Sequence, residues 1–341
     1  MAKWERTIFV TGGAGFIGSN FVKFLRKERP KWRIVNFDAL TYAGNLDNLR
    51  ELADDEGHHF VHGDIRDRNG VTKAIDGCDG VIHLAAESHV DRSINDAGPF
   101  VSTNVVGTQV LCDVCVESKA IDRFVHIGTD EVYGSLPLER TDLKFVETMP
   151  VQPRSPYAAS KAAGDLLVLA FAETFHLPAV VTRCSNNFGP NQFPEKVIPL
   201  FVTNLIDGKK VPLYGDGRNV RDWLHVLDHC EAILAVFERG RVGEVYNIGG
   251  NNERSNLELT HTILKLMRKD ESMIEPVADR PGHDRRYAID ASKIEKELGW
   301  KPTRSQWPTA LMDTLEWYQD HEWWWRPLKD KAFNATMLKR E

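Results

Sequence analysis

The sequence predicts an α/β protein: a doubly wound parallel sheet with helices on both faces, joined to a smaller, intertwined C-terminal region. Over the first 185 residues of this 341-residue chain, short apolar runs alternate with segments of helical periodicity, and this alternation is typical of βαβ units. A glycine-rich turn directly follows the first apolar run. Beyond about residue 186 the alternation fades into segments rich in Pro, Gly and Asn.

Five short apolar runs are the expected strands of the sheet. They cover residues 7–13, 33–38, 60–64, 80–86 and 123–129. Helical spacing in the segments between them, such as IGSNFVKFLRKE and NVVGTQVLCDVCVES, predicts the helices that cover its faces. A further helix is expected over about 156–175, leading to the strand-like PAVVTRCSN. Ligands of such sheets bind at the carboxyl ends of the strands.

The turn TGGAGFIGSN places Gly12, Gly15 and Gly18 between the first expected strand and the first helix. Glycines there let the backbone approach a pyrophosphate, and the helix N-terminus offers unpaired N–H groups to the phosphates. Asp38 ends the second expected strand, where an acid accepts hydrogen bonds from ribose hydroxyls and repels a 2′-phosphate. Residues 39–42 contain no Arg or Lys. The sequence therefore predicts a Rossmann-type site for NAD rather than NADP.

We expect the NAD-binding Rossmann domain, which also carries the catalytic residues, to span 1–185. A mainly substrate-binding region is expected over 186–341, with a part at about 225–250 that returns to the Rossmann domain. Within this region, 243–250 resembles another strand and 279–290 an irregular surface segment. The aromatic-rich tail DTLEWYQDHEWWWRP is expected to form an amphipathic helix whose three consecutive tryptophans serve packing.

Composition excludes several classes of function. The chain is 42% hydrophobic and 27% charged with a net charge of −6, and no long run of one sign predicts a nucleic-acid or polybasic membrane surface. We expect no signal peptide, and no apolar stretch near the roughly 20 residues of a membrane span. Five cysteines, an odd number, suit a reducing cytoplasm. Cys112 and Cys115 form a C-x-x-C inside a helical pattern, so buried thiols are expected there and no metal site.

A pair of residues with catalytic potential lies in SPYAASKAA, where Tyr157 and Lys161 are four positions apart. On a helix this spacing places both side chains on one face. An ammonium beside a phenol, aided by a positive nicotinamide ring, favours the phenolate and lowers the pKa of the tyrosine. The tyrosine can then accept the proton of an alcohol while hydride leaves for NAD.

Three further reactive side chains, Thr129, Asp130 and Glu131, follow the apolar run RFVHIG. The threonine hydroxyl can orient the reacting alcohol. Oxidation of an alcohol needs no further acid or base, so the two carboxyls imply a second step. Next to a newly formed ketone, one carboxylate can remove the acidified proton of the neighbouring carbon while a neutral carboxyl protonates a departing hydroxyl one carbon further on. Adjacent strand residues point to opposite faces, so this requires the strand to end at Asp130.

The spacing G-x-x-G-x-x-G and the segment HLAA resemble the extended short-chain dehydrogenase/reductase family. The segments TDEVYG, SPYAASKA, NNFGPNQFPEKVIPL and RDWLHVLDH resemble its nucleotide-sugar 4,6-dehydratase branch, from residue 7 to about 300. By this resemblance Asp130 is the acid and Glu131 the base. Besides Gly12, Gly15, Gly18, Asp38, Tyr157 and Lys161, the implied cofactor contacts are Phe16, Ile17, Thr41, Asp64, Ile65, Leu84, Ala85, Ala86, Thr103 and Asn187. The implied substrate contacts are Ser88, Thr129, Asn186, Lys196, Val197, Pro212, Tyr214, Arg221, Asn256 and His283.

Arg221 is also expected on chemical grounds, since a guanidinium binds a diphosphate in bidentate fashion. The resemblance implies a cytoplasmic homodimer that acts on a nucleoside-diphosphate hexose, with dTDP-glucose ahead of the UDP- and GDP-linked sugars. A C4 epimerase or a sugar-acid decarboxylase is an open alternative, although either leaves Asp130 and Glu131 without a task. A non-catalytic NAD-binding scaffold is the alternative of another class, and it has no need for the Tyr-Lys and acid pairs.

Overall fold

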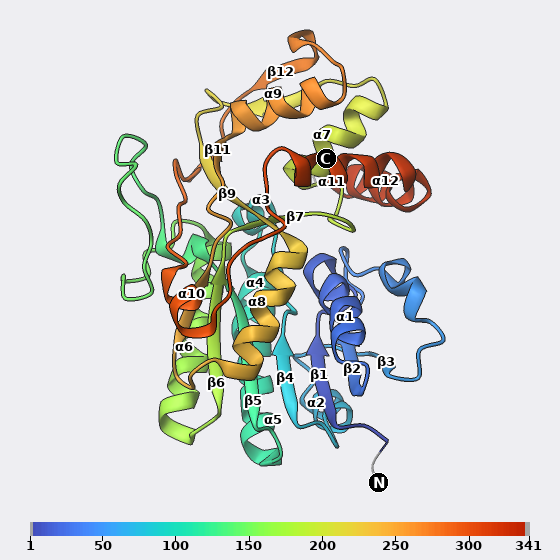
Figure 1. Ribbon diagram of the computed structural model, residues 1–341, viewed down its shortest axis with the longest axis vertical. Coiled ribbons are helices and arrows are strands. Elements are labelled where there is room, and N and C mark those ends of the chain that lie inside the picture. Colours follow the sequence, from blue (N-terminus) through green and yellow to red (C-terminus); the bar gives the residue numbers. More distant parts are fainter. Residues whose placement is uncertain (1–2, 338–341) are drawn as a thin grey trace.

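The central sheet has seven strands, in the order β3-β2-β1-β4-β5-β6-β10, in this computed structural model, which describes residues 3–337 (Figure 1). All of its pairings are parallel. The strands are β1 (Arg6–Thr11), β2 (Trp32–Asp38), β3 (His58–His62), β4 (Gly80–His83), β5 (Arg123–Thr129), β6 (Ala179–Cys184) and β10 (Val245–Ile248). The chain reverses its direction of travel across the sheet between β1 and β4, and such a switch point opens a crevice for ligands.

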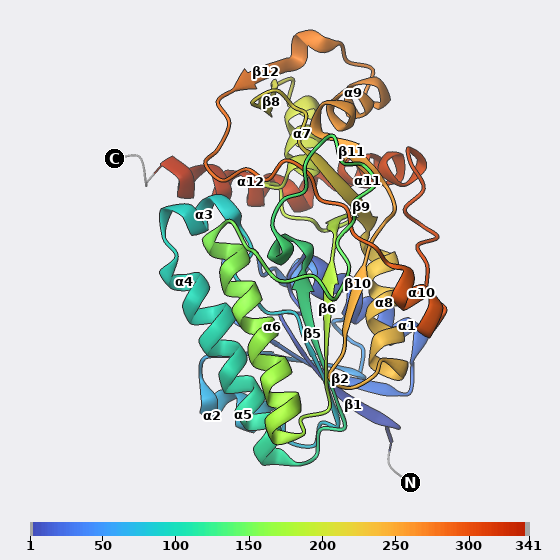
Figure 2. The same ribbon diagram turned by 90° about the vertical axis from the view of Figure 1, so that its left-hand side faces the viewer.

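Helices cover both faces of the sheet and bury two separate apolar clusters (Figure 2). One face carries α1 (Phe16–Glu28), α8 (Val226–Arg239) and α10 (Ser292–Leu298). The other carries α2 (Arg68–Ala74), α5 (Thr108–Ser118) and α6 (Pro156–Phe175). Because both faces are buried, the strands consist of nearly continuous apolar residues, as expected for an all-parallel sheet. The doubly wound fold predicted from the sequence is confirmed.

The C-terminal region forms an upper layer above the strand ends. Its small sheets pair β7 (Asn186–Phe188), β9 (Val220–His225) and β11 (Glu253–Ser255), and separately β8 (Val211–Tyr214) and β12 (Ile274–Val277). Its helices are α7 (Val197–Ile206), α9 (Asn256–Leu266), α11 (Thr309–Asp320) and α12 (Glu322–Met337). Three of its segments, α8, β10 and α10, pack into the sheet domain. The chain therefore crosses between the two parts several times.

Two sequence expectations about the second half need correction. The segment 279–290 is irregular, as expected, but it is not a surface segment throughout, because Tyr287, Ala288 and Ile289 are buried against Val132 and Phe145. The tail forms two helices rather than one, and the chain turns between them at His321.

A third expectation, the absence of any apolar stretch of membrane-spanning length, is also wrong. The continuous helical run Gly98–Ser118 has 21 residues and is apolar enough to cross a membrane by length and composition. It comprises α4 (Gly98–Val101), the π-helical turn η2 (Ser102–Gly107) and α5. It packs along α6, and 44% of its apolar window is buried in the fold. A core helix of a soluble protein passes the same test of length and hydropathy.

Candidate active site

A cavity of about 430 Å³ lies at the carboxyl ends of the central strands, at the switch point between β1 and β4. All five residues predicted to be catalytic and all sixteen predicted cofactor contacts line this cavity. Of the predicted substrate contacts, the residues that line it are Ser88, Thr129, Asn186 and Lys196. The others belong to the C-terminal region and are Val197, Pro212, Tyr214, Arg221, Asn256 and His283. The fold therefore brings the predicted catalytic and cofactor residues to one cavity, and the role of each residue is a prediction.

The glycine turn has the shape that a pyrophosphate needs. Gly12 has φ +73°, and a Cβ there would lie 2.6 Å from the backbone nitrogen of Ala85. A Cβ at Gly18 would meet the carbonyl oxygen of Gly12 at 2.1 Å, so α1 packs against the turn only because this residue is glycine. A Cβ at Gly15 would meet only that oxygen, at 3.4 Å, and would otherwise project into open space. No acidic side chain occupies the first turn of α1, so its N–H groups suit an anion.

Asp38 terminates β2 at the wall of the cavity and organises the turn beside it. Its carboxylate accepts hydrogen bonds from the backbone nitrogens of Ala14, at 2.9 Å, and Leu40, at 2.8 Å. Burial raises the pKa of Asp38, and these two hydrogen bonds lower it in part. Arg66 also lines the cavity, but it forms an ion pair with Asp64 at 2.5 Å. The residues present therefore fit a dinucleotide with a free 2′-hydroxyl.

The helix α6 presents Tyr157 and Lys161 to the cavity. Ser155 caps its N-terminus, and its hydroxyl accepts a hydrogen bond from the backbone nitrogen of Ala158 at 3.1 Å. Lys161 is buried, and its Nζ donates to the carbonyl oxygen of Ile127 at 2.7 Å. Burial, followed by the charge of Glu131, raises the pKa of Tyr157 well above its usual range. Burial and the charge of Glu131 thus act against the lowering expected from the sequence, which also depends on the positive charge of a nicotinamide ring.

Asp165 gives Lys161 a buried counter-charge, although it was not singled out in the sequence. It lies one turn further along α6, and its carboxylate accepts a hydrogen bond from Nε of Arg183 at 2.9 Å. Burial lowers the pKa of Lys161, and the charge of Asp165 opposes that effect. The spacing of four from Lys161 could have indicated this residue, since it places both side chains on one face of the helix.

The two acids share the cavity because the strand ends where the sequence requires it to end. β5 stops at Thr129, and Asp130 begins the 3-10 helix η3 (Asp130–Tyr133). The Thr129 hydroxyl caps this helix by accepting a hydrogen bond from the backbone nitrogen of Glu131 at 3.3 Å. Asp130 and Glu131 both line the cavity, whereas adjacent residues of a regular strand would point to opposite faces of the sheet.

The surroundings of the two carboxyls differ in charge. Burial, then the charge of Glu131 and that of Asp222, raises the pKa of Asp130 well above its usual range. Burial also raises the pKa of Glu131, but the positive charges of Arg221, Arg280 and Lys196 lower it in part. The contrast favours the proton on Asp130 over Glu131.

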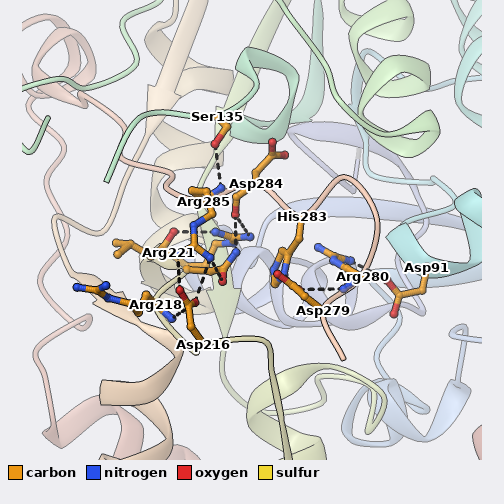
Figure 3. A network of polar contacts seen from close by, with 12 residues as sticks. Asp91, Ser135, Asp216, Arg218, Arg221, Asp279, Arg280, His283, Asp284 and Arg285 are labelled. Atoms are coloured by element: carbon orange, nitrogen blue, oxygen red, sulfur yellow. Dashed lines mark hydrogen bonds and ion pairs between the residues drawn. The ribbon is translucent and has the colours of Figure 1, made fainter. Parts of the chain in front are cut away.

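The two arginines near Glu131 belong to a polar network of the C-terminal region (Figure 3). Arg221 is buried, stacks over the ring of Tyr287 at 4.1 Å and donates to the carbonyl oxygen of Asp284 at 3.0 Å. Arg280 is held by an ion pair with Asp91 at 2.7 Å. Partners within the protein therefore hold both guanidinium groups.

Several cavity residues were missed by reasoning from the sequence. They include Tyr42, Glu87, Cys184, Ser185, Gln192 and Glu195. Glu195 lies within the segment FPEKVIP, whose resemblance to the dehydratase branch was a usable signal. Arg280, which acts on Glu131 from a segment without regular structure, had no comparable signal.

Replacement of Arg280 with glutamine is expected to shift the acid limb of the pH profile. A general base must be ionised, so kcat/KM rises as pH increases through the pKa of Glu131. Removing the positive charge of Arg280 raises that pKa, and the acid limb therefore moves to higher pH. The measurement is kcat/KM against pH, with Arg285→Gln as the control because Arg285 pairs with Asp216 instead. An unchanged acid limb in Arg280→Gln would contradict the assignment of Glu131 as the base.

A doubly wound sheet with this glycine turn and a Tyr-Lys pair at its strand ends defines an extended short-chain dehydrogenase/reductase. Residues 9–307 match the family described as GDP-mannose 4,6 dehydratase. The chain belongs to that family.

Named relatives extend this similarity over almost the whole chain. A dTDP-glucose 4,6-dehydratase from Streptomyces niveus is 53% identical over 326 residues, which cover 94% of this chain and 95% of the relative. The crystal structure of DesIV, a dTDP-glucose 4,6-dehydratase from Streptomyces venezuelae with NAD and TYD bound, has a TM-score of 0.91 and 49% identity, covering 94% and 99% of the two chains. The corresponding enzyme from Bacillus anthracis, in complex with NAD, has a TM-score of 0.87 and 49% identity, covering 95% and 99%.

Proposed function

We propose that this protein is an NAD-dependent nucleotide-sugar 4,6-dehydratase that converts dTDP-glucose to dTDP-4-keto-6-deoxyglucose and water. The observation that carries the proposal is one cavity that holds Thr129, Asp130 and Glu131 together with Tyr157 and Lys161. About half of the residues are identical to those of relatives named for this activity. The acid pair distinguishes a dehydratase from an enzyme that only oxidises and reduces an alcohol.

The residues proposed to carry out oxidation at C4 of the sugar lie on α6 and at the end of β5. Tyr157 accepts the proton of the C4 hydroxyl, and Thr129 hydrogen-bonds the same oxygen and fixes its orientation. NAD⁺, when bound, supplies the hydride acceptor for C4, the positive charge that favours the phenolate, and later the hydride donor for C6. Lys161 adds a second positive charge, which Asp165 helps to maintain in a buried place.

The carboxyl groups of Asp130 and Glu131 are proposed to carry out the elimination of water. The ketone at C4 acidifies the C5–H bond, and the ionised Glu131 accepts that proton. The neutral Asp130 donates a proton to the C6 hydroxyl, which departs as water as the C5–C6 double bond forms. After reduction at C6, Glu131 returns its proton to C5. The charge difference between the surroundings of the two acids supports this division of roles.

The diphosphate of the substrate is assigned to the cationic groups around Glu131. Arg221 and Lys196 are the predicted substrate contacts in this group, and Arg280 is a third cation that completes it. A guanidinium suits bidentate binding of phosphate oxygens. We assign Tyr214 and His283, whose rings lie 6.4 Å apart, and Asn256 to the remainder of the sugar nucleotide.

The experiment that tests the function is incubation of the purified protein with NAD and, in parallel, dTDP-, UDP- and GDP-hexoses. The expected result is a 4-keto-6-deoxy sugar, detected by mass as the loss of one water, with dTDP-glucose as the preferred substrate. Preference for a UDP- or GDP-hexose would correct the base specificity. An inverted alcohol or released carbon dioxide would replace the proposal with a C4 epimerase or a decarboxylase. Bound NAD without turnover of any hexose would favour a scaffold.

We further propose that the protein is a cytoplasmic homodimer. Its five cysteines are free thiols, which suits a reducing compartment. Val101, Val106 and Leu166 are exposed on the neighbouring helices that cover one face of the sheet. Such apolar side chains on adjacent helices are typical of a surface that a second subunit covers.

A further inference from the structure

The three consecutive tryptophans of α12 occupy three different environments. Trp323 is 50% exposed, whereas Trp324 and Trp325 are only 3% and 0% exposed. The indole nitrogen of Trp325 donates to the carbonyl oxygen of Tyr318 at 2.8 Å, so it braces α12 against α11. The indole nitrogen of Trp324 instead donates to the side-chain oxygen of Asn48 at 2.8 Å, which lies outside the helix pair. Among the three tryptophans, Trp324 alone forms a hydrogen bond from the described part of α12 to the dinucleotide-binding domain.

Asn48 also forms a hydrogen bond to the glycine turn. It is buried in the 3-10 helix η1 (Leu46–Leu52), and its amide nitrogen donates to the carbonyl oxygen of Ala14 at 2.9 Å. Asn45 donates to the same oxygen through its backbone nitrogen, at 3.0 Å. Ala14 lies between Gly13 and Gly15, and its own nitrogen is held by Asp38. A continuous buried path therefore leads from the indole of Trp324 to the backbone of the glycine turn.

The same helix pair also holds a loop on another side of the cavity. The hydroxyl of Tyr318 donates to the carbonyl oxygen of Gln192 at 2.5 Å, and the Gln192 side chain donates to the carbonyl oxygen of Asn187 at 2.9 Å. Gln192 and Asn187 both line the cavity. Tyr42, another lining residue, packs against the apolar cluster that contains Trp324 and Trp325.

We propose that α11 and α12 act as a clasp that retains the dinucleotide, with Trp324 as the positioning residue that fixes the glycine turn through Asn48. The proposal rests on the proposed function in taking the cavity to hold NAD. A cofactor that accepts and then returns hydride within one catalytic cycle must not dissociate between the two steps. Fixing the turn before binding lowers the entropic cost of ordering it around the ligand. The clasp lies beyond residue 307, where the match to the family ends.

The test compares Trp324→Phe with the matched control Trp325→Phe. Each change removes one buried indole hydrogen bond, but only the first disconnects the glycine turn. The measurement is the rate at which bound NAD leaves the purified protein after rapid removal of free NAD, with no sugar nucleotide present. Because Trp324→Phe leaves the side-chain oxygen of Asn48 with only the longer hydrogen bond from Nδ2 of Asn191, at 3.4 Å, we expect dissociation to accelerate about tenfold in Trp324→Phe and less than about twofold in Trp325→Phe.

A double-mutant cycle with Asn48→Ala separates the path from general loosening of the tail. If Trp324 acts through Asn48, the double variant releases NAD no faster than the faster of the two single variants. The proposal would be overturned if the effects of Trp324→Phe and Asn48→Ala on the NAD dissociation rate multiply in the double variant. Equal acceleration of that rate in Trp324→Phe and Trp325→Phe would also overturn it. Should Trp324→Phe not fold, Asn48→Ala alone carries the comparison with Trp325→Phe. Since no sugar is present, this result is independent of whether any hexose is turned over.

Discussion

Glu131→Gln is expected to form reduced nicotinamide from dTDP-glucose and then to stall before water is lost. The amide cannot accept the C5 proton, whereas Tyr157, Lys161 and Thr129 still support the oxidation at C4. General-base catalysis typically contributes about 10²- to 10⁴-fold, and we expect a loss of this size in the overall rate. The measurements are single-turnover absorbance of the reduced cofactor and mass analysis of the sugar. Gln is nearly isosteric with Glu, so the cavity should keep its shape.

The accumulation of reduced nicotinamide serves as the internal control in this experiment. It demonstrates that the variant is folded, binds both ligands and completes the first step. Full turnover by Glu131→Gln would contradict the assignment of the base. Absence of the reduced cofactor would place Glu131 in the oxidation instead of the elimination.

Tyr157→Phe is expected to suppress the oxidation itself, so that neither reduced nicotinamide nor product forms at an appreciable rate. The phenol is the only group assigned to accept the C4 hydroxyl proton, and its loss should lower the rate of the first step by about 10²- to 10⁴-fold. Burial and the charge of Glu131 hold the pKa of Tyr157 high, so the proton transfer depends on the positive charges of Lys161 and bound NAD⁺.

Tyr246→Phe is the matched control for this variant. Tyr246 is also a buried tyrosine of the sheet domain, but its hydroxyl donates to Glu297 and it does not line the cavity. It should retain the oxidation even if the fold loses some stability. Normal formation of reduced nicotinamide by Tyr157→Phe would reject this residue as the base of the first step.

The strands, the helix that carries Tyr157 and the glycine turn could be predicted because each is encoded locally. The helix expected at about 156–175 is found at Pro156–Phe175, where Ser155 caps it and Pro156 occupies its first turn. The polar residues of the irregular segment 279–290 predict a surface location. Its sequence does not indicate that Tyr287, Ala288 and Ile289 are buried. Its burial depends on partners such as Phe145, more than 130 residues earlier, and local pattern carries no information about them.

The sequence alone determined the fold class, the dinucleotide turn and the presence of a hydroxyl, two acids and a Tyr-Lys pair, because periodicity and spacing along the chain specify these features. The tertiary structure decided that the charge of Asp222 raises the pKa of Asp130 while the charge of Arg280 lowers that of Glu131, and thereby which carboxyl favours the proton. It also decided that Trp324 reaches Asn48, 276 residues away in the sequence. Electrostatic and hydrogen-bonding partners act through space, so their identities emerge only when the chain has folded.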